Sequence, residues 1–291
     1  MAIGIEQLRD YSSIFSRGVA AALLKGDRTA LDSKIARYDT HWYARCGATY
    51  LQYLRHAYRS VEAHYRNEYV LKNNFLTEWL LRELGQSDSR VFSEFRAGKS
   101  VADLVIFNGI SKAFEIKTEL DSDQRLPSQL THYAKVFNEV YLIVPEGKVD
   151  TYSKYTDVAG LITYNETGRS FDLTKQASRN MHVCAETMMG SLRSEEYKEL
   201  VCEHYGELPT MTSFTQFSIC QALIQKIPNE RLNALFIGAM KRRKQHGIFS
   251  MRYYRELNQL VLAMRLSDVQ RRELIASLDV PISRSTCTTP S

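Results

Sequence analysis

Long apolar runs and paired cysteines are both missing from this sequence of 291 residues. The apolar stretches are short, such as 140–144, whereas a helix that spans a bilayer needs about 20 apolar residues. The five cysteines include no CxxC pair, which argues against a disulfide framework and against a structural zinc site. The first residues have no basic segment followed by an apolar one, so nothing indicates export. We therefore expect a cytoplasmic protein with reduced thiols and no contact with membranes.

Glycine and proline are also scarce, with 14 and 6 residues, while hydrophobic residues make up 44% of the chain. This composition excludes collagen-like and disordered classes and predicts a globular protein with a core. The motifs GxxxxGK[ST], GxGxxG, HExxH and GxSxG do not occur. Their absence argues against an intrinsic ATPase, a dinucleotide enzyme, a zincin and a serine hydrolase.

Hydrophobic periodicity divides the chain into three regions and a tail. Residues 1–60 form an N-terminal helical region, 61–175 a mixed α/β core, and 176–280 a C-terminal helical region, whereas 281–291 have little to bury and are expected to be disordered. The predicted core elements are, in order, a helix over 65–84, strands near 91, 101 and 111, a helix over 127–137, and strands over 139–144 and 160–164. We therefore predict an α/β fold with a mixed sheet, flanked by helical regions at both ends.

Within the core, the strands near 101 and 111 are joined by Asn108 and Gly109. Asn-Gly is the preferred pair for a type I′ turn, in which both central residues have positive φ, so these two strands are predicted to form a hairpin. A helix then leads to the apolar strand over 139–144. A strand, helix and strand in succession predict a crossover that makes the second strand parallel to the first.

Charged side chains interrupt the apolar pattern of this hairpin. Asp103 lies in the first strand, and Glu115 and Lys117 share one face of the second, because side chains alternate along a strand. A covered sheet excludes charges, so we expect all three to cluster at its wet end. Two neighbouring carboxylates favour a hard cation such as Mg²⁺ or Mn²⁺, which would suit phosphodiester hydrolysis. The alternative is a simple salt bridge at a sheet edge, and the short pattern alone favours it.

The wider context makes catalysis more plausible. The order αβββαβ, with Asp103 and an ExK motif on two strands of one hairpin, resembles the PD-(D/E)XK nuclease superfamily. The segments RNEYVLKN, SEFRAG, ADLVIFNG, EIKTELDSDQR and QLTHYAKVFNEVYLIVP are similar to a largely uncharacterised bacterial group of that superfamily, known by an sce-type locus tag. The resemblance covers about 65–175. The proline of the superfamily motif is Ala102 here, but that proline binds no metal.

The resemblance implies roles for individual residues. Asp103, Glu115 and the backbone carbonyl of Ile116 match the metal ligands, and Lys117 matches the catalytic lysine. Glu68 matches an acid on the first helix that binds or orients a second metal ion. Gln129 matches a residue beside the metal site.

Several positions leave alternatives open. Glu78 and Glu94 are rivals for the role of Glu68. Gln129 and Tyr133 are four residues apart on one helix face. In one interpretation Gln129 contacts phosphate or water and Tyr133 contacts the nucleic acid, whereas in the other, equally favoured, the two form a partly buried structural pair.

Basic side chains offer two further candidate contacts with nucleic acid. Lys241, Arg242, Arg243 and Lys244 form a run in a segment with nine basic and two acidic residues from 241 to 272, in a chain of net charge +5. This run fits a solvated helix surface as well as a phosphate contact. Arginines and tyrosines also alternate through residues 38–66. Such side chains can stack on bases and bind phosphates, although tyrosines on amphipathic helices more often pack their rings.

The sequence thus favours a Mg²⁺-dependent nuclease acting on DNA, less readily on RNA, by attack of a metal-activated water, with 5′-phosphate and 3′-hydroxyl ends implied by the resemblance. The alternative is a non-catalytic module of the same fold that binds nucleic acid or a partner protein, since a fold does not guarantee activity. A homo-oligomer is compatible with either function.

Overall fold

The protein's architecture was obtained as a computed structural model, which describes residues 3–65, 67–80, 89–119, 121–165, 170–244 and 252–283. The chain packs as two compact units. We call residues 1–77 with 246–291 the helical unit, and residues 78–245 the sheet unit. Each has its own hydrophobic core. This division differs from the three predicted regions, because helices from both ends of the chain bury their apolar faces in one core, and periodicity does not tell which helix covers which.

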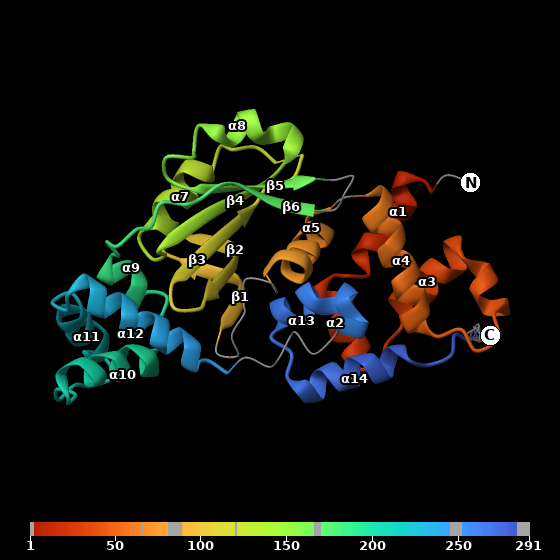
Figure 1. The fold of residues 1–291 in the computed structure, drawn as a ribbon. Coiled ribbons are helices and arrows are strands. Elements are labelled where there is room, and N and C mark those ends of the chain that lie inside the picture. Colours follow the sequence, from red (N-terminus) through yellow and green to blue (C-terminus); the bar gives the residue numbers. More distant parts are fainter. Residues whose placement is uncertain are drawn as a thin grey trace. The chain divides into compact units, whose positions relative to one another are not determined.

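The helical unit is built from two distant parts of the chain (Figure 1). Its elements are α1 (Ile5–Ser13), α2 (Arg17–Leu24), α3 (Thr29–Tyr38), η1 (Thr40–Ala44), α4 (Tyr50–His64), α5 (Glu68–Asn74), η5 (Arg252–Leu257), α13 (Asn258–Met264) and α14 (Asp268–Leu278). The backbone N–H of Tyr50 donates to the carbonyl of Val280, and that of Ile282 donates to Ala48. These bonds fasten the segment that follows α14 to the start of α4 and to the loop before it.

The helix expected over 65–84 is shorter and less regular in the structure. It begins at Glu68, because the side chain of Asn67 caps it by accepting a hydrogen bond from the N–H of Val70 at 2.9 Å. From Phe75 to Leu80 it continues as a π-helical segment, η2. Residues 81–84 lie outside the described residues.

The sheet unit contains a six-stranded mixed sheet in the order β1-β2-β3-β4-β5-β6. Its elements are β1 (Arg90–Ala97), β2 (Ser100–Phe107), β3 (Ser111–Ile116), α7 (Leu126–Ala134), β4 (Glu139–Pro145), η3 (Glu146–Lys148), α8 (Val149–Ser153), β5 (Gly160–Asn165), β6 (Ser170–Lys175), α9 (Ala185–Met189), α10 (Ser194–Tyr205), α11 (Gln216–Ile224) and α12 (Asn229–Arg242). β1 pairs antiparallel with β2 and β2 pairs antiparallel with β3, whereas β3, β4 and β5 are mutually parallel. The predicted α/β class, the mixed sheet and the crossover through α7 are confirmed.

Two local details of the sheet were not predicted. Three residues connect β2 and β3, and only Gly109 among them has positive φ, at 107°. The hairpin is therefore confirmed, but its type I′ turn is wrong, because Asn108 does not adopt the left-handed conformation. The edge strand β6 pairs antiparallel with β5 and is mostly exposed. Its side chains are too polar to signal a strand by hydrophobic alternation.

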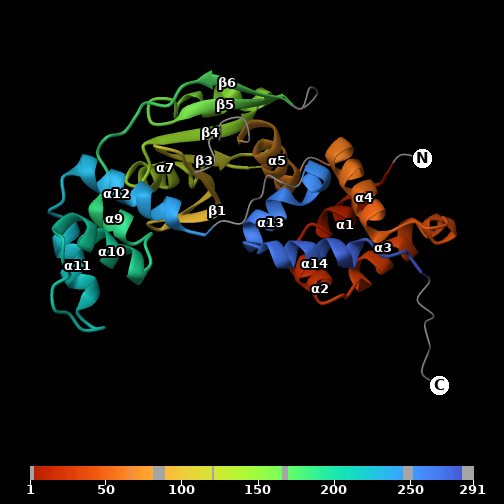
Figure 2. The ribbon, with the colours of Figure 1, turned by 60° about the horizontal axis from the view of Figure 1, so that its bottom comes forward.

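Helices from the second half of the unit complete the core of the sheet. Figure 2 shows α9, α10, α11 and α12 gathered at one end of this unit. Phe236 of α12 contacts Phe107 of β2, with ring centroids 5.8 Å apart, and both side chains are fully buried. Much of the predicted C-terminal helical region is thus part of the sheet unit's core. In the described residues, no helix has both the length and the apolar character to cross a membrane.

We predict that Gly160→Ala destabilises the sheet unit by about 1–3 kcal/mol through overpacking. A Cβ atom at Gly160 would lie 2.6 Å from the backbone nitrogen of Ala177 and 2.6 Å from the ring of Tyr141. Gly238→Ala is the control, because its Cβ would meet only the end of a flexible arginine at 3.5 Å. Chemical denaturation followed by circular dichroism checks this, and equal stabilities of the two variants would contradict it.

Candidate active site

The register of the first hairpin brings two carboxylates to one face of the sheet. Leu104 pairs with Phe114, so the same register continued by one residue sets Asp103 opposite Glu115. Opposite residues of antiparallel strands share a face, with Cβ atoms about 5 Å apart. Asp103 is half-buried, and its Oδ2 accepts a hydrogen bond from the backbone N–H of Ile116 at 2.8 Å. The two strands thus hold both acids side by side.

Glu115 is the centre of a buried polar cluster. It is only 4% exposed, and its Oε1 accepts hydrogen bonds from Lys117 Nζ at 2.9 Å and from Gln129 Nε2 at 2.7 Å. Lys117 Nζ also donates to Gln129 Oε1 at 3.2 Å, so the three side chains form a closed triangle of contacts. A buried carboxylate is tolerated only when it is paired and hydrogen-bonded, and here both conditions are met.

Helix α7 supplies the two polar side chains that cover this cluster. Gln129 and Tyr133 are four residues apart on one face, and α7 packs on β2 and β4. The hydroxyl oxygen of Tyr133 lies 2.7 Å from Glu115 Oε2 and 2.8 Å from the carbonyl oxygen of Val101. A phenol has one proton, so it donates to one of these two acceptors at a time. Of the two open interpretations of this pair, the structure bears out the buried one for Tyr133, while Gln129 contacts both the acid and the lysine.

The pKa of Tyr133 reports on its electrostatic surroundings. Burial raises it well above its usual value, and the negative charges of Glu115 and, more weakly, Asp103 act in the same direction. Both carboxylates are therefore close enough to the hydroxyl to affect its ionisation. This agrees with the register, which puts Asp103 and Glu115 on the face that α7 covers.

The expected wet end of the hairpin is only partly wet. Lys117 is 8% exposed and Glu115 is more buried still, whereas Asp103 and Gln129 are half-buried. The prediction that all three charges are solvated is wrong, because α7 crosses the sheet directly above them. Access from solvent is through Asp103 and Gln129.

The donor set suits a hard cation in its chemistry. Asp103 and Glu115 offer carboxylate oxygens, and the carbonyl of Ile116 is in the adjoining position of β3. Within the described ranges, no group of three or more His, Cys, Asp and Glu side chains converges as a metal set. A cation at this site would therefore be held by two side chains together with backbone and water oxygens.

The third predicted acid, Glu68, belongs to the helical unit. Its side chain is 62% exposed and forms an ion pair with Lys72 one turn along α5. Its rival Glu78 lies in η2. The assignment of Glu68 to the metal site thus stays a prediction.

Glu94 has the stronger structural link to the pair. It lies in β1 between Ser93 and Phe95, which pair with Leu104 and Ala102, so it is level with Asp103. Its φ is +53°, a left-handed conformation that is costly for a residue other than glycine. Strained residues of this kind are frequent at functional sites. Nothing in the sequence VFSEFRA signals this conformation.

The basic run near residue 241 is mostly engaged within the sheet unit. Arg243 Nε and one terminal nitrogen bind the two carboxylate oxygens of Glu196, each at 2.7 Å, and its side chain is only 12% exposed. Arg242 pairs with Glu203 at 3.3 Å. The predicted phosphate contact of Arg243 is therefore corrected to a structural one, since its bidentate partner fixes it inside the protein. Lys241 and Lys244 lie at the end of α12 and just beyond, and Lys244 is exposed.

Tyr133 needs the same correction as a predicted nucleic-acid contact. Its side chain is fully buried and its hydroxyl faces Glu115 and Val101. It therefore acts on Glu115 from within the core and presents no surface to a ligand.

Comparisons with known proteins identify one protein family and a relative from a bacteriophage. Residues 61–270 match the protein family described as Bacteriophage P4 protein cII. The curated relative "Protein cII" of Enterobacteria phage P4 is 25% identical over 173 residues, which make up 58% of this chain and 64% of that protein. The chain thus matches less than two thirds of the length of this relative. No solved structure matches the chain.

We predict that Tyr133→Phe lowers the free energy of unfolding by about 1–3 kcal/mol, because a buried hydrogen bond to Glu115 is lost. Because the pKa of Tyr133 is raised in the folded protein, its contribution to the free energy of unfolding is present below pH 10, the usual pKa of a tyrosine. Above pH 10 the unfolded chain ionises more readily than the folded one, so the contribution falls and the stability difference between Tyr133→Phe and wild type should shrink. Tyr155→Phe is the control, since its hydroxyl binds Asp123 near the surface at 2.8 Å. Denaturation curves at pH 7 and above pH 10 provide the measurement. Equal effects of both substitutions at pH 7 would be inconsistent with the buried cluster.

We further predict that Glu94→Gly is more stable than Glu94→Ala by about 1 kcal/mol, because only glycine adopts positive φ without strain. Both variants remove the carboxylate, so their difference isolates the backbone. Thermal or chemical unfolding of the pair gives the answer, and an alanine variant as stable as the glycine variant would refute the strained conformation.

Proposed function

This chain belongs to the Bacteriophage P4 protein cII family, and we propose that it is a metal-dependent nuclease that hydrolyses phosphodiester bonds in DNA. The observation that carries the proposal is the placement of Asp103 opposite Glu115, with Lys117 bonded to Glu115 at 2.9 Å. Two acids and an amine on one sheet face are the groups that such hydrolysis requires. RNA is a less favoured substrate.

The order of elements supports a PD-(D/E)XK type of core. Helix α5 is followed by β1, β2, β3, α7 and β4, with Asp103 on β2 and the ExK motif at the end of β3. The Ala102 that replaces the motif proline is fully buried in the sheet core, where its small size fits. We include this fold assignment in the proposal.

The proposed roles follow from the contacts of each side chain. Asp103, Glu115 and the Ile116 carbonyl would hold Mg²⁺ or Mn²⁺. The ion, when bound, would supply a water of lowered pKa and offset charge on the phosphate. Lys117, held against Glu115 and Gln129, is positioned to orient a water or to stabilise negative charge on phosphorus.

The supporting residues act on the acids. Gln129 holds Glu115 Oε1 at 2.7 Å, and Tyr133 holds Oε2 at the same distance, so the carboxylate has little freedom to rotate. The N–H of Ile116 orients Asp103 in a similar way. Such preorganisation contributes to catalysis because the groups need not reorganise during the reaction. The half-buried Asp103 and Gln129 would meet the phosphate first.

We predict that Asp103→Asn, Glu115→Gln and Lys117→Met each reduce cleavage by at least about 100-fold, because each removes a charge needed in the transition state. The measurement is the rate of cleavage of labelled single-stranded and duplex DNA with Mg²⁺ or Mn²⁺. Asp150→Asn is the control, because this exposed acid on α8 makes the same change of charge away from the site. Circular dichroism establishes that each variant is folded. If wild type cleaves DNA no faster than background with both Mg²⁺ and Mn²⁺, the nuclease proposal is rejected.

One observation favours the second candidate function, a non-catalytic module that binds nucleic acid or a partner protein. Both oxygens of Glu115 already accept hydrogen bonds from side chains of the protein. Such a cluster is stable as a purely structural feature. Calorimetry separates the two, because a metal-binding enzyme should release heat with Mn²⁺ and lose that heat in Asp103→Asn.

A further inference from the structure

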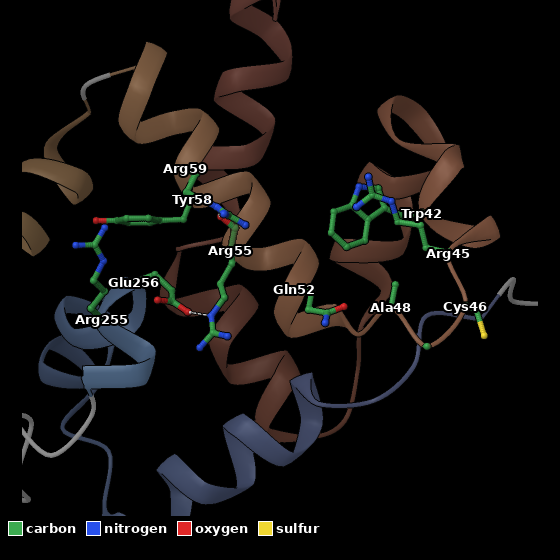
Figure 3. A pocket seen from close by; sticks show the side chains of 11 residues that line it. Trp42, Arg45, Cys46, Ala48, Gln52, Arg55, Tyr58, Arg59, Arg255 and Glu256 are labelled. Carbon is green, nitrogen blue, oxygen red and sulfur yellow. Dashed lines mark hydrogen bonds and ion pairs between the residues drawn. The ribbon is translucent and has the colours of Figure 1, made fainter.

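The helical unit contains an arginine-rich pocket that the proposed nuclease site does not use. The pocket has a volume of about 820 Å³, and Figure 3 shows the side chains around it. Its lining comes from η1, the following loop, one side of α4 and the last turn of η5. All of these segments belong to the helical unit, so the pocket is complete within it.

Four arginines line this pocket, and they differ in their partners. Arg55 pairs with the buried Glu256 at 2.8 Å. A terminal nitrogen of Arg255 lies 3.9 Å from a carboxylate oxygen of the buried Glu62. Arg45 lies over the ring of Trp42, 4.5 Å from its centroid, and Arg59 donates a hydrogen bond to the backbone carbonyl of Arg55. In the described part of the chain, neither Arg45 nor Arg59 has a carboxylate partner. The pocket therefore carries positive charge that no carboxylate of the described residues neutralises.

The arginines form a row along the pocket. Arg55 and Arg59 are four residues apart on α4, which sets their Cα atoms about 6 Å apart on one side of the helix. Gln52, Arg55 and Arg59 follow one another along α4, and Arg45 lies beyond Gln52 (Figure 3). The intervening Tyr53 and Tyr58 are buried. Of the alternating side chains, Arg45, Arg55 and Arg59 thus line the pocket, and the buried Tyr58 also borders it. Arg66 lies outside the described residues.

A buried donor without a partner also lies at this pocket. Trp42 is 4% exposed, and its indole Nε1 has no hydrogen-bond partner among the described residues. A buried N–H without a partner destabilises the folded protein, so such groups are rare unless a water or ligand pairs with them. Trp42 therefore offers a donor next to the guanidinium of Arg45.

The positive charge of the pocket arginines affects the pKa of the neighbouring His56. Burial lowers its pKa, Asp39 opposes this, and the charges of Arg59 and Arg45 lower it further. The imidazole lies 3.9 Å from the carboxylate of Asp39, yet the net shift is downward. The charges of Arg45 and Arg59 thus act on the same side chain, His56.

We propose that this pocket binds the phosphodiester backbone of a nucleic acid. Guanidinium groups match phosphate oxygens in planar, bidentate contacts, and the unpaired Arg45 and Arg59 mark the two ends of the row. A row of cations along a helix suits successive phosphates of one strand better than a single compact anion. The inference goes beyond the proposed nuclease activity, because it concerns the helical unit and needs no cleavage.

The test is binding of a fluorescein-labelled DNA 30-mer to the full-length protein in EDTA, as single strand and as duplex. We expect the double variant Arg45→Gln/Arg59→Gln to bind at least about tenfold more weakly, with a log-affinity against log-salt slope reduced by about 1 for each lost contact. The matched control is Arg9→Gln/Arg272→Gln, which removes two exposed arginines of the same unit outside this pocket. It should bind nearly as wild type.

Two further variants change the charge at the pocket without altering a buried residue. Cys46 is exposed and lines the pocket. Cys46→Lys should therefore tighten binding, and Cys46→Glu should weaken it. Both leave the buried side chains untouched, so a change in affinity cannot come from loss of folding. An unchanged affinity and salt slope in Arg45→Gln/Arg59→Gln, or equal losses in it and its control, would overturn the proposal.

Two further experiments complete the test: competition by small phosphates, and a control variant in the sheet unit. Pyrophosphate or a mononucleotide that competes as strongly as the oligonucleotide, at equal phosphate concentration, would overturn the assignment to a nucleic-acid backbone. Asp150→Asn, which changes an exposed acid of the sheet unit outside the proposed catalytic site, should bind the DNA in EDTA as wild type does. Because binding is measured in EDTA, where no metal-dependent cleavage takes place, its loss in Arg45→Gln/Arg59→Gln supports the pocket whatever the cleavage assay shows, so the two proposals fail separately.

Discussion

The buried carboxylate of Glu115 imposes the strongest constraint on the sheet unit. A charge that is 4% exposed is stable only if neighbouring groups replace its lost water, and Lys117, Gln129 and Tyr133 do so. Two of these come from α7, so the cluster ties the helix to the sheet at one place. Removing Lys117 would leave the charge of Glu115 without an opposite charge in the core. The same contacts that make the acid tolerable also fix its orientation.

This constraint links the fold to the proposed chemistry. The crossover from β3 through α7 to β4 brings Gln129 and Tyr133 over the end of the hairpin that carries Asp103 and Glu115. A cation-binding pair and its support are therefore assembled from adjacent elements of one unit. The arginine pocket belongs to the helical unit, so it is built from other parts of the sequence than the acid pair and rests on a different hydrophobic core. A nuclease with such a pocket would hold DNA by phosphate contacts that do not depend on the catalytic acids.

The sequence predicted the elements that carry strong local signals. Alternation in β2 and β3, the turn residue Gly109 and the apolar β4 were sufficient for the hairpin and the crossover. The register that sets Asp103 opposite Glu115 was not predicted in this way, because a two-residue turn would have paired Phe107 with Ile110, whereas Phe107 pairs with Ser111. The sequence failed where a partner distant in the chain decides the outcome. Arg243 was expected at a surface but binds Glu196, and the polar edge strand β6 forms because β5 is beside it.

By itself, the sequence determined the α/β class, the order of the core strands and the residues able to perform acid, amine and cation chemistry, because these follow from local periodicity and side-chain type. Only the tertiary structure decided that Glu115 and Lys117 are buried, that both ends of the chain share a helical unit, and that the arginines near residue 50 line a pocket. Burial and pairing depend on which surfaces of the folded chain meet, and the residues that meet can be far apart in the sequence, as Arg55 and Glu256 are with a separation of 201 residues.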